Sequence, residues 1–326
     1  MVNNRMTVVK KFNIVRFITF ILALILVIGG IVYAINRVVK ENKYKETYEY
    51  KFTNKGYSIE EFNKLDSKLD DKQLDKLLTY DYDSSIIDLI NEKYFIWGKL
   101  DEYRSYIKKN KEKDLHKAVS IINTEAYVEW IDEERETNVE DGDLMLVNRL
   151  YGLSSDYEPE LSKIPVKYAL EGKKISTSIL NKLTDLIDSG KENGFTFIVT
   201  EAYRSYNTQK DIYNSYVDLN GRAEADKIVA RPGHSEYQTG LTLDLEPYAK
   251  TFENPMESDE YKWLRANAHK YGFIFRLDSD KEYITGFKAS TWKLRYVGEE
   301  AAKVMYDENI CLEEYYGYYI KGEKNE

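Results

Sequence analysis

Histidine and cysteine are the side chains that most often hold metals or attack substrates, and this 326-residue chain has few of them. Its three histidines are His116, His234 and His269, so a metal centre built mainly on imidazole would have almost no spare ligands. Cys311 is the single cysteine, which excludes an internal disulfide and a Cys-x-x-Cys zinc site. We interpret Cys311 as a small buried apolar residue rather than a nucleophile. Any chemistry must therefore come from longer motifs.

Three short blocks in the C-terminal half combine charged, polar and aromatic residues in a fixed order. The first reads YRSYNTQ, residues 203–209, and follows a predicted strand, where a loop would present side chains to a cleft. The second reads RPGHSEYQTGLTLDL, residues 231–245. The third reads WLRANAHKYGF, residues 263–273, and continues as TWKLRYVG, residues 291–298.

The order and spacing of these blocks resemble the VanY-type D-alanyl-D-alanine carboxypeptidases, which are LAS metallopeptidases, over about residues 165–320. The resemblance implies an α+β domain with a small sheet flanked by helices, and hydrolysis of the terminal D-Ala-D-Ala bond of peptidoglycan stem peptides. In that family zinc is held by a His, an Asp seven residues later and a His in the third block. A Glu three residues before the last His is the general base.

Only one of these four positions keeps the family's residue, Asp244. Tyr237 replaces the first His, Lys293 replaces the last His, and Ser290 replaces the catalytic Glu. A tyrosine binds zinc only as phenolate, from a free pKa of about 10, and a lysine ammonium has no lone pair. Lys293 could instead form a salt bridge with Asp244 in place of the ion. We therefore expect neither bound zinc nor hydrolysis by the family's mechanism.

What remains around these positions has the character of a binding cleft. The resemblance implies that Arg204 points into the site and holds substrate or developing negative charge. By the same resemblance the further candidates for substrate binding are Ser205, Gln209, Ser235, Gln238, Asp244, Trp292 and Tyr296. The alternative interpretation is that this set only preserves the fold, with Trp292 in the core.

Three functions therefore stay open. The first is a pseudoenzyme of the cell wall that binds peptidoglycan stem peptides or a cell-wall protein. The second is an active carboxypeptidase with an unorthodox metal site made of His234, Tyr237 and Asp244. The third is an interaction protein in which residues 36–142 recognise the partner. The formal net charge of −9 argues against nucleic acid as a partner.

An apolar run near the N-terminus bears on location. Residues 17–35 carry no charge over 19 positions, close to the roughly 20 that cross a bilayer as a helix. We predict a single-pass anchor preceded by a cytoplasmic tail, residues 1–16; a signal peptide cleaved after Ala34 is the alternative. Basic residues flank both ends equally, and the short N-terminal tail favours an extracytoplasmic C-terminal domain.

The remaining chain reads as two regions. Residues 36–142 are predicted to form a charged, largely helical spacer or small subdomain, with apolar residues three and four apart over residues 74–90 and a strand-like run at 118–131. Residues 143–326 are predicted to form one VanY-like domain. Its helices are expected near 175–192, capped by Ser176, 207–219 and 259–271, and its strands at 194–203, 239–246 and 272–277.

Overall fold

The computed structural model describes residues 14–130 and 135–321, and the chain divides into two compact units between Asn91 and Glu92. Most of the predicted cytoplasmic tail, residues 1–13, lies outside the described residues. Residues 92–142, which we expected to be spacer, group with the C-terminal residues in the second unit.

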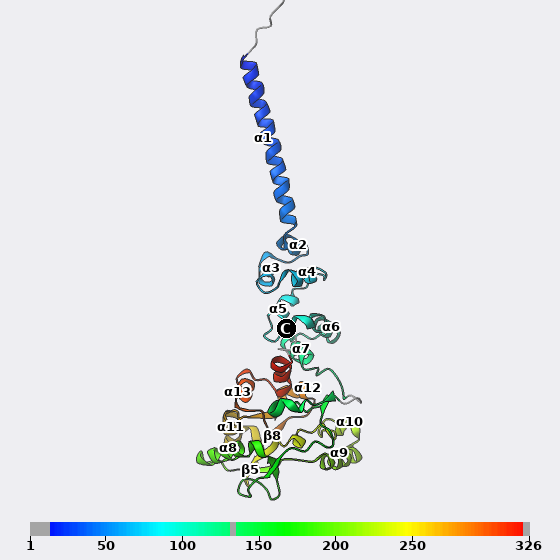
Figure 1. The fold of residues 1–326 in the computed structure, drawn as a ribbon, viewed down its shortest axis with the longest axis vertical. Coiled ribbons are helices and arrows are strands. Elements are labelled where there is room, and N and C mark those ends of the chain that lie inside the picture. Colours follow the sequence, from blue (N-terminus) through cyan, green and yellow to red (C-terminus); the bar gives the residue numbers. More distant parts are fainter. Residues whose placement is uncertain (1–13, 131–134, 322–326) are drawn as a thin grey trace, which may run out of the picture. The chain divides into compact units, whose positions relative to one another are not determined.

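The first unit begins with one long helix and continues as four short ones (Figure 1). Helix α1 spans Ile14–Lys45, and its part from Phe17 to Lys45 is long and apolar enough to cross a membrane. The short helices are α2 (Tyr48–Asn54), α3 (Ile59–Asp66), α4 (Asp71–Leu77) and α5 (Ser85–Asn91). Capping boxes at Ser58 and Asp70 begin α3 and α4, and α4 and α5 bury the leucines and isoleucines of the predicted amphipathic pattern.

The second unit opens with helices where a strand was expected. The 3₁₀ turn Trp97–Lys99 leads into α6 (Leu100–Asn110), followed by α7 (Leu115–Asn123). The strand prediction for residues 118–131 was therefore wrong. Asp114 caps α7 by accepting from the Lys117 N–H at 3.0 Å, and the β-branched residues that suggested a strand lie on its buried face.

One four-stranded antiparallel sheet forms the centre of the second unit, in the order β5-β6-β8-β7. Its strands are β5 (Phe197–Glu201), β6 (Thr242–Pro247), β8 (Ser290–Tyr296) and β7 (Phe273–Leu277). Strands β5, β6 and β7 confirm the three predicted strands, whereas β8 was not predicted. Two small ribbons accompany it: β1 (Arg135–Glu136) with β2 (Tyr151–Gly152), and β3 (Leu161–Lys163) with β4 (Lys174–Ser176).

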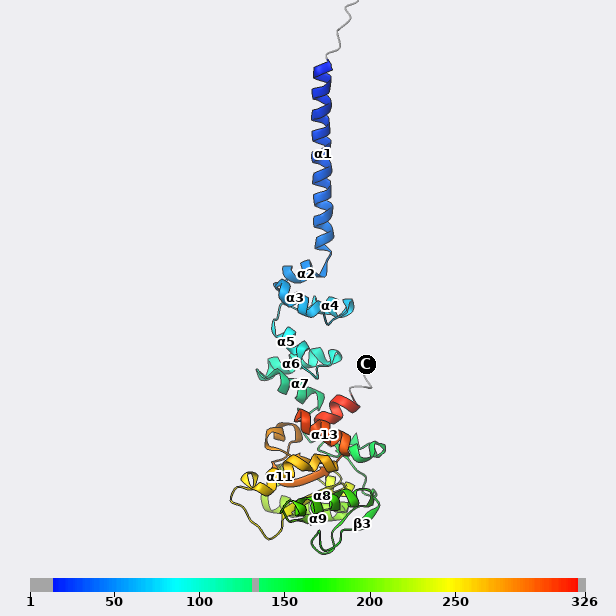
Figure 2. The same cartoon turned by 90° about the vertical axis from the view of Figure 1, so that its left-hand side faces the viewer.

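Helices flank this sheet, giving the α+β architecture. Figure 1 places α8 (Leu180–Glu192) and α11 (Asp259–Asn267) on one side of the sheet and α9 (Tyr206–Asn220) and α10 (Arg222–Ala225) on the other. Figure 2 shows α11 between α8 and α13 (Glu299–Glu308). The shorter elements are α12 (Glu282–Thr285), α14 (Leu312–Tyr315), a final π-helical turn Tyr316–Ile320, and 3₁₀ turns at Val139–Leu144, Thr177–Ile179, Glu236–Thr239, Pro255–Glu257, Ala268–Tyr271 and Ser279–Lys281. Ser176 ends β4 and does not cap α8, because the 3₁₀ turn intervenes.

The two faces of the sheet differ in chemistry. Leu243, Leu245 and Leu294 project into the main apolar core with residues of α8 and α11. Because side chains alternate along a strand, Asp244 and Lys293 leave from the opposite face. The sheet thus has an apolar face that holds the fold together and a polar face that is free for a site.

Two glycines of the sequence motifs are required by geometry. Gly240 ends the 3₁₀ turn before β6 with φ +70°, and a Cβ there would meet the Ser176 nitrogen at 3.1 Å. Gly272 precedes β7 with φ +85°, and a Cβ would meet the Tyr296 ring at 2.5 Å. Both glycines serve close packing at strand entrances rather than chemistry.

Candidate functional site

Three ionisable residues lie side by side across the polar face of the sheet. In the antiparallel register Asp244 of β6 pairs with Lys293 of β8 on one side and with Glu201 of β5 on the other. Directly paired residues project from the same face and their Cβ atoms are neighbours. The register therefore brings together the aspartate and lysine of two separate motifs.

Tyr237 lies against this group from the 3₁₀ turn Glu236–Thr239 and is buried. Its hydroxyl donates to Oδ1 of Asp244 at 2.7 Å. Burial, together with the charge of Asp244, raises the pKa of Tyr237 well above its ordinary value. Tyr237 is therefore a neutral hydrogen-bond donor and not the phenolate that zinc would need.

The Lys293 ammonium sits over the ring of Tyr237, 4.4 Å from its centroid. Within residues 14–130 and 135–321, the ion pair expected between Lys293 and Asp244 is not formed, and the Tyr237 hydroxyl takes that carboxylate instead. Burial lowers the pKa of Lys293, and the nearby carboxylates of Asp244 and Glu236 offset part of that effect. Lys293 thus meets an aromatic face rather than a carboxylate.

Arg204, which precedes α9, meets the same ring, with its Cζ 4.1 Å from the Tyr237 centroid. Its Nη2 donates to Glu201 at 3.1 Å and its Nη1 to Gln209 at 3.5 Å, while its buried Nε has no partner among the described residues. Burial would raise the pKa of Glu201, but Lys173 at 2.9 Å, a backbone N–H and Arg204 hold it below its ordinary value.

Of this group, Arg204, Tyr237 and Lys293 line a cleft of about 90 Å³, and the lining does not include Asp244 or Glu201. The polar lining residues are Arg204, Gln209, His234, Ser235, Glu236, Tyr237, Arg276 and Lys293, and the apolar ones include Val147, Ile228, Val229, Leu277 and Phe287. Arg204, Gln209 and Ser235 therefore lie where the sequence interpretation put them, at the cleft. The cleft lining thus combines charged and polar side chains with aliphatic and aromatic ones.

A buried network of charges supports the cleft from behind. The Arg276 Nε donates to Glu236 at 2.6 Å and its Nη2 to Glu313 at 2.6 Å, while Arg295 donates to the other Glu236 oxygen at 3.1 Å. Burial alone would raise the pKa of Glu313, but Arg276 lowers it below its ordinary value. Sequence reasoning missed this network, although Glu236 and Arg295 stand inside the motif blocks.

Four of the proposed substrate-binding residues have structural contacts instead. Ser205 accepts from the Thr208 N–H as the cap of α9, and Gln238 donates to a loop carbonyl at 2.9 Å. Trp292 packs edge-on against Tyr261, and Tyr296 packs on a neighbouring core phenylalanine. The cleft lining does not include these four side chains. For Trp292 this agrees with the core alternative.

The described residues do not fit zinc. No group of three or more His, Cys, Asp and Glu side chains in residues 14–130 and 135–321 could hold a metal ion. His234, which the unorthodox site would need, has its Nδ1 at 2.7 Å from the Asn148 carbonyl oxygen. Cys311 is buried, and burial raises the pKa of its thiol well above the ordinary value. Ser290, the first residue of β8, has a hydroxyl where the resemblance puts the general-base Glu, so its own side chain cannot be a carboxylate base.

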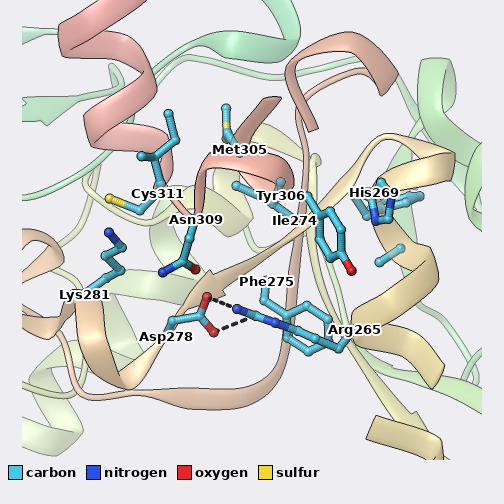
Figure 3. Close-up of a pocket in the computed structure, with 13 residues that line it drawn as sticks. Arg265, His269, Ile274, Phe275, Asp278, Lys281, Met305, Tyr306, Asn309 and Cys311 are labelled. Carbon is cyan, nitrogen blue, oxygen red and sulfur yellow. Dashed lines mark hydrogen bonds and ion pairs between the residues drawn. The ribbon is translucent and has the colours of Figure 1, made fainter. Parts of the chain in front are cut away.

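A larger cavity of about 260 Å³ lies apart from the motif cleft, between the end of α11, β7 and α13 (Figure 3). Arg265 and Asp278 form a two-point ion pair at 2.7 Å across one side, and His269 stacks on Tyr306 with ring centroids 3.8 Å apart. Its charged lining groups are already paired, so the motif cleft offers more free donors than this larger cavity.

A family model and several known proteins are similar to this chain. A family model described as VanY, D-alanyl-D-alanine carboxypeptidase, matches residues 172–299. A D-alanyl-D-alanine carboxypeptidase of Enterococcus faecium is 32% identical over 248 residues, which cover 73% of this chain and 75% of that protein. The solved LdcB LD-carboxypeptidase, whose structure is described as revealing the molecular basis of peptidoglycan recognition, matches with a TM-score of 0.54 and 36% identity, over 58% of this chain and 92% of its own.

Two further relatives match a shorter stretch. YodJ of Bacillus subtilis (strain 168), to which a carboxypeptidase activity is attributed, is 41% identical over 182 residues. A D-alanyl-D-alanine carboxypeptidase of Enterococcus faecalis (strain ATCC 700802 / V583) is 35% identical over 181 residues. Each match covers 53% of this chain, and the chain spans 66% of YodJ and 65% of the Enterococcus faecalis protein, just under two thirds.

Proposed function

Because the chain belongs to the VanY family of D-alanyl-D-alanine carboxypeptidases, we propose that it is a membrane-anchored, extracytoplasmic member that binds peptidoglycan stem peptides in the cleft without cleaving them. A cell-wall protein that presents a similar chain end is the alternative ligand. The observation that carries the proposal is the pairing of Tyr237 with Asp244 beneath the Lys293 ammonium. Tyr237 and Lys293 stand where the resemblance puts the two zinc-binding histidines, and Asp244 is the acidic ligand that the chain retains.

The chemistry of these groups supports binding rather than hydrolysis. The Tyr237 hydroxyl already uses an oxygen of the one remaining acidic ligand, and the ammonium of Lys293 would repel a divalent cation. Ser290 has a hydroxyl where the resemblance puts the catalytic Glu, so its side chain cannot act as a carboxylate base that activates a water. Arg204 still faces the cleft with an unused Nε–H, so a group that accepts hydrogen bonds can be held there.

The location is proposed from α1. An apolar helix from Phe17 to Lys45 suits an anchor, and peptidoglycan lies outside the cytoplasmic membrane. The structural neighbour described in terms of peptidoglycan recognition supports the same compartment. Processing after Ala34 would leave the domain extracytoplasmic but untethered.

The deciding experiment measures zinc and D-alanine release on one sample. The full chain in detergent is incubated with zinc, desalted and analysed for metal, and a pentapeptide ending in D-Ala-D-Ala is tested for release of D-alanine. The Enterococcus faecalis relative serves as the control. We expect no stoichiometric zinc and no release, together with measurable peptide binding. About one zinc per chain with release of D-alanine would mean that the chain is an enzyme with substituted ligands.

Binding by residues 36–142 alone would favour the third interpretation, in which that region recognises the partner. A chain that lacks residues 36–91, the part of this region outside the second unit, tests it without cutting into the unit that holds the cleft. If this variant still binds the pentapeptide, recognition lies in the cleft domain. If binding is lost while the cleft domain stays folded, the cleft is not the recognition site.

A further inference from the structure

The hydrogen-bonding groups around the cleft are unequally used. On the acceptor side, both Glu236 oxygens are taken by Arg276 and Arg295, and Asp244 accepts from Tyr237. On the donor side, Lys293 has no hydrogen bond or ion pair in residues 14–130 and 135–321, and its ammonium rests on an aromatic ring. The cleft therefore presents spare donors and little spare acceptor capacity.

The cations of the cleft are not equivalent. Arg276 has donors committed to Glu236 and to both oxygens of Glu313, so it has little left for a ligand. Arg204 and Lys293 both rest on the ring of Tyr237, and Arg204 has a buried Nε without a partner. An ammonium has three hydrogen-bond donors and the Nε of a guanidinium has one, and together these donors can bind a small anion.

The walls of the cleft restrict which anion fits. Asp244 pairs in register with Lys293, so a doubly charged anion at the ammonium would meet a carboxylate at close range. A singly charged, planar carboxylate meets less repulsion. The lining also contains Val229, Leu277 and Phe287, whose apolar side chains suit a small aliphatic group beside the charge.

We propose that the Lys293 ammonium, with the Arg204 Nε–H, binds the free C-terminal carboxylate of a peptide whose last residue has a small apolar side chain. The inference rests on the proposed function and names the chemical group that the cleft recognises. Lys293, which replaces a metal ligand of the family, becomes a ligand-binding cation in this chain. Substrate selection would then depend on a free chain end and not on the peptide sequence alone.

The test compares two peptides that differ only in the charge of that end. The full chain in detergent is titrated by calorimetry with a pentapeptide ending in D-Ala-D-Ala as the free acid, and with the same peptide as the C-terminal amide. We expect the acid to bind at least about tenfold more tightly, which corresponds to about 1.4 kcal/mol. Lys293→Met should weaken binding of the acid by about tenfold or more and leave binding of the amide unchanged.

Three controls separate the sources of an effect. Lys293→Arg keeps a cation and should retain part of the preference for the acid. Lys303→Met removes a lysine whose ion pair with Asp307 is exposed on α13, and should change neither affinity. Inorganic phosphate should compete only at concentrations well above those of the acid peptide.

The possible failures are distinguishable. Equal affinity for acid and amide, or unchanged binding of the acid by Lys293→Met, would overturn this inference while the proposed peptide binding still stands. Phosphate that competes as well as the acid peptide would show that the cleft binds charge alone, and would overturn the choice of a peptide end. If neither peptide binds, the proposed function itself fails.

Discussion

Lys293→Met should make the domain more stable, which is the opposite of what a structural salt bridge predicts. Methionine has about the length of lysine and can lie on the Tyr237 ring without a charge. Asp244 keeps its hydrogen bond from the Tyr237 hydroxyl at 2.7 Å, so the substitution leaves that carboxylate with a partner. The change therefore removes a partly buried ammonium whose desolvation destabilises the fold, because no hydrogen-bond acceptor among the described residues compensates for the lost water.

The two interpretations of Lys293 differ in sign as well as size. If the ammonium is kept for ligand binding, its removal should stabilise the second unit by about 0.5–2 kcal/mol, or roughly 1–8 °C in Tm for a unit of this size. If Lys293 were the essential counterion of Asp244, removal of one partner of a buried pair would cost about 3–5 kcal/mol. Tm would then fall by roughly 6–20 °C.

The pH dependence gives an independent check. The pKa of Lys293 is lowered in the folded state, so between that value and the unfolded value of about 10.4 the unfolded chain binds more protons and wild-type stability rises with pH. The destabilisation caused by the buried ammonium is complete below the pKa of Lys293 in the folded state, and it disappears as the pH approaches the pKa of lysine in the unfolded chain. The advantage of Lys293→Met should therefore be largest at neutral pH and small near pH 10.

The assay is thermal unfolding of the full chain in detergent, followed by tryptophan fluorescence at neutral and alkaline pH. Lys281→Met is the matched control, because the Lys281 ammonium lies 2.9 Å from Glu314 and both side chains are buried. It should lose about 3–5 kcal/mol. If Lys293→Met lowers Tm as Lys281→Met does, the reasoning on Lys293 is refuted and its role is structural.

Three further outcomes follow from the same site. Tyr237→Phe should lower the free energy of unfolding by about 1.5 kcal/mol, the low end for a hydrogen bond to a charged group, because Asp244 stays partly exposed. Urea unfolding measures this loss, and an unchanged urea midpoint would contradict the hydrogen bond between Tyr237 and Asp244. The pKa of Tyr237 is raised in the folded state, so its stabilising effect is complete below the pKa of about 10 that tyrosine has in the unfolded chain, and is lost as the pH rises above that value. Between neutral pH and about pH 11, the free energy of unfolding should therefore fall less for Tyr237→Phe than for the wild type. The triple variant Tyr237→His, Ser290→Glu, Lys293→His should bind about one zinc per chain by metal analysis, because it completes the family's ligand set around Asp244; zinc content no higher than in the wild type would show that the backbone no longer supports the metal geometry.

The sequence was most informative where its patterns are local. The charge-free run at residues 17–35 predicted an apolar helix because length and polarity alone decide that outcome. Three of the four strands of the central sheet were predicted from short β-branched and aromatic runs, and β8 was missed. The same criterion failed at residues 118–131, where the β-branched residues of α7 are buried on a helix. The same helix contacts a distant part of the chain, because the Ser120 hydroxyl donates to Glu314.

The site shows the complementary limit. The resemblance predicted that Arg204 and Asp244 would line one cleft and that Lys293 could lie near Asp244. Cross-strand register does bring Asp244 and Lys293 together, but the cleft lining includes Arg204 and Lys293 and not Asp244. Spacing could not tell which donor Asp244 would accept from, because that depends on where the turn Glu236–Thr239 places the Tyr237 ring. The ion pair of Arg276 with Glu313 joins residues outside the motif blocks, so no local signal announced it.

The substitutions at the family's zinc positions form one cooperating set rather than independent losses. Tyr237 supplies the hydrogen bond that Asp244 would otherwise exchange with a metal, and its ring supplies the surface on which Lys293 rests. A single Lys293→His change would leave Asp244 bound to Tyr237, and Tyr237→His alone would leave the ammonium of Lys293 beside any incoming cation. Each of these single variants should therefore bind no zinc, and only variants that change both Tyr237 and Lys293 should make Asp244 accessible to a metal ion. Neither single substitution would restore metal binding as a first step.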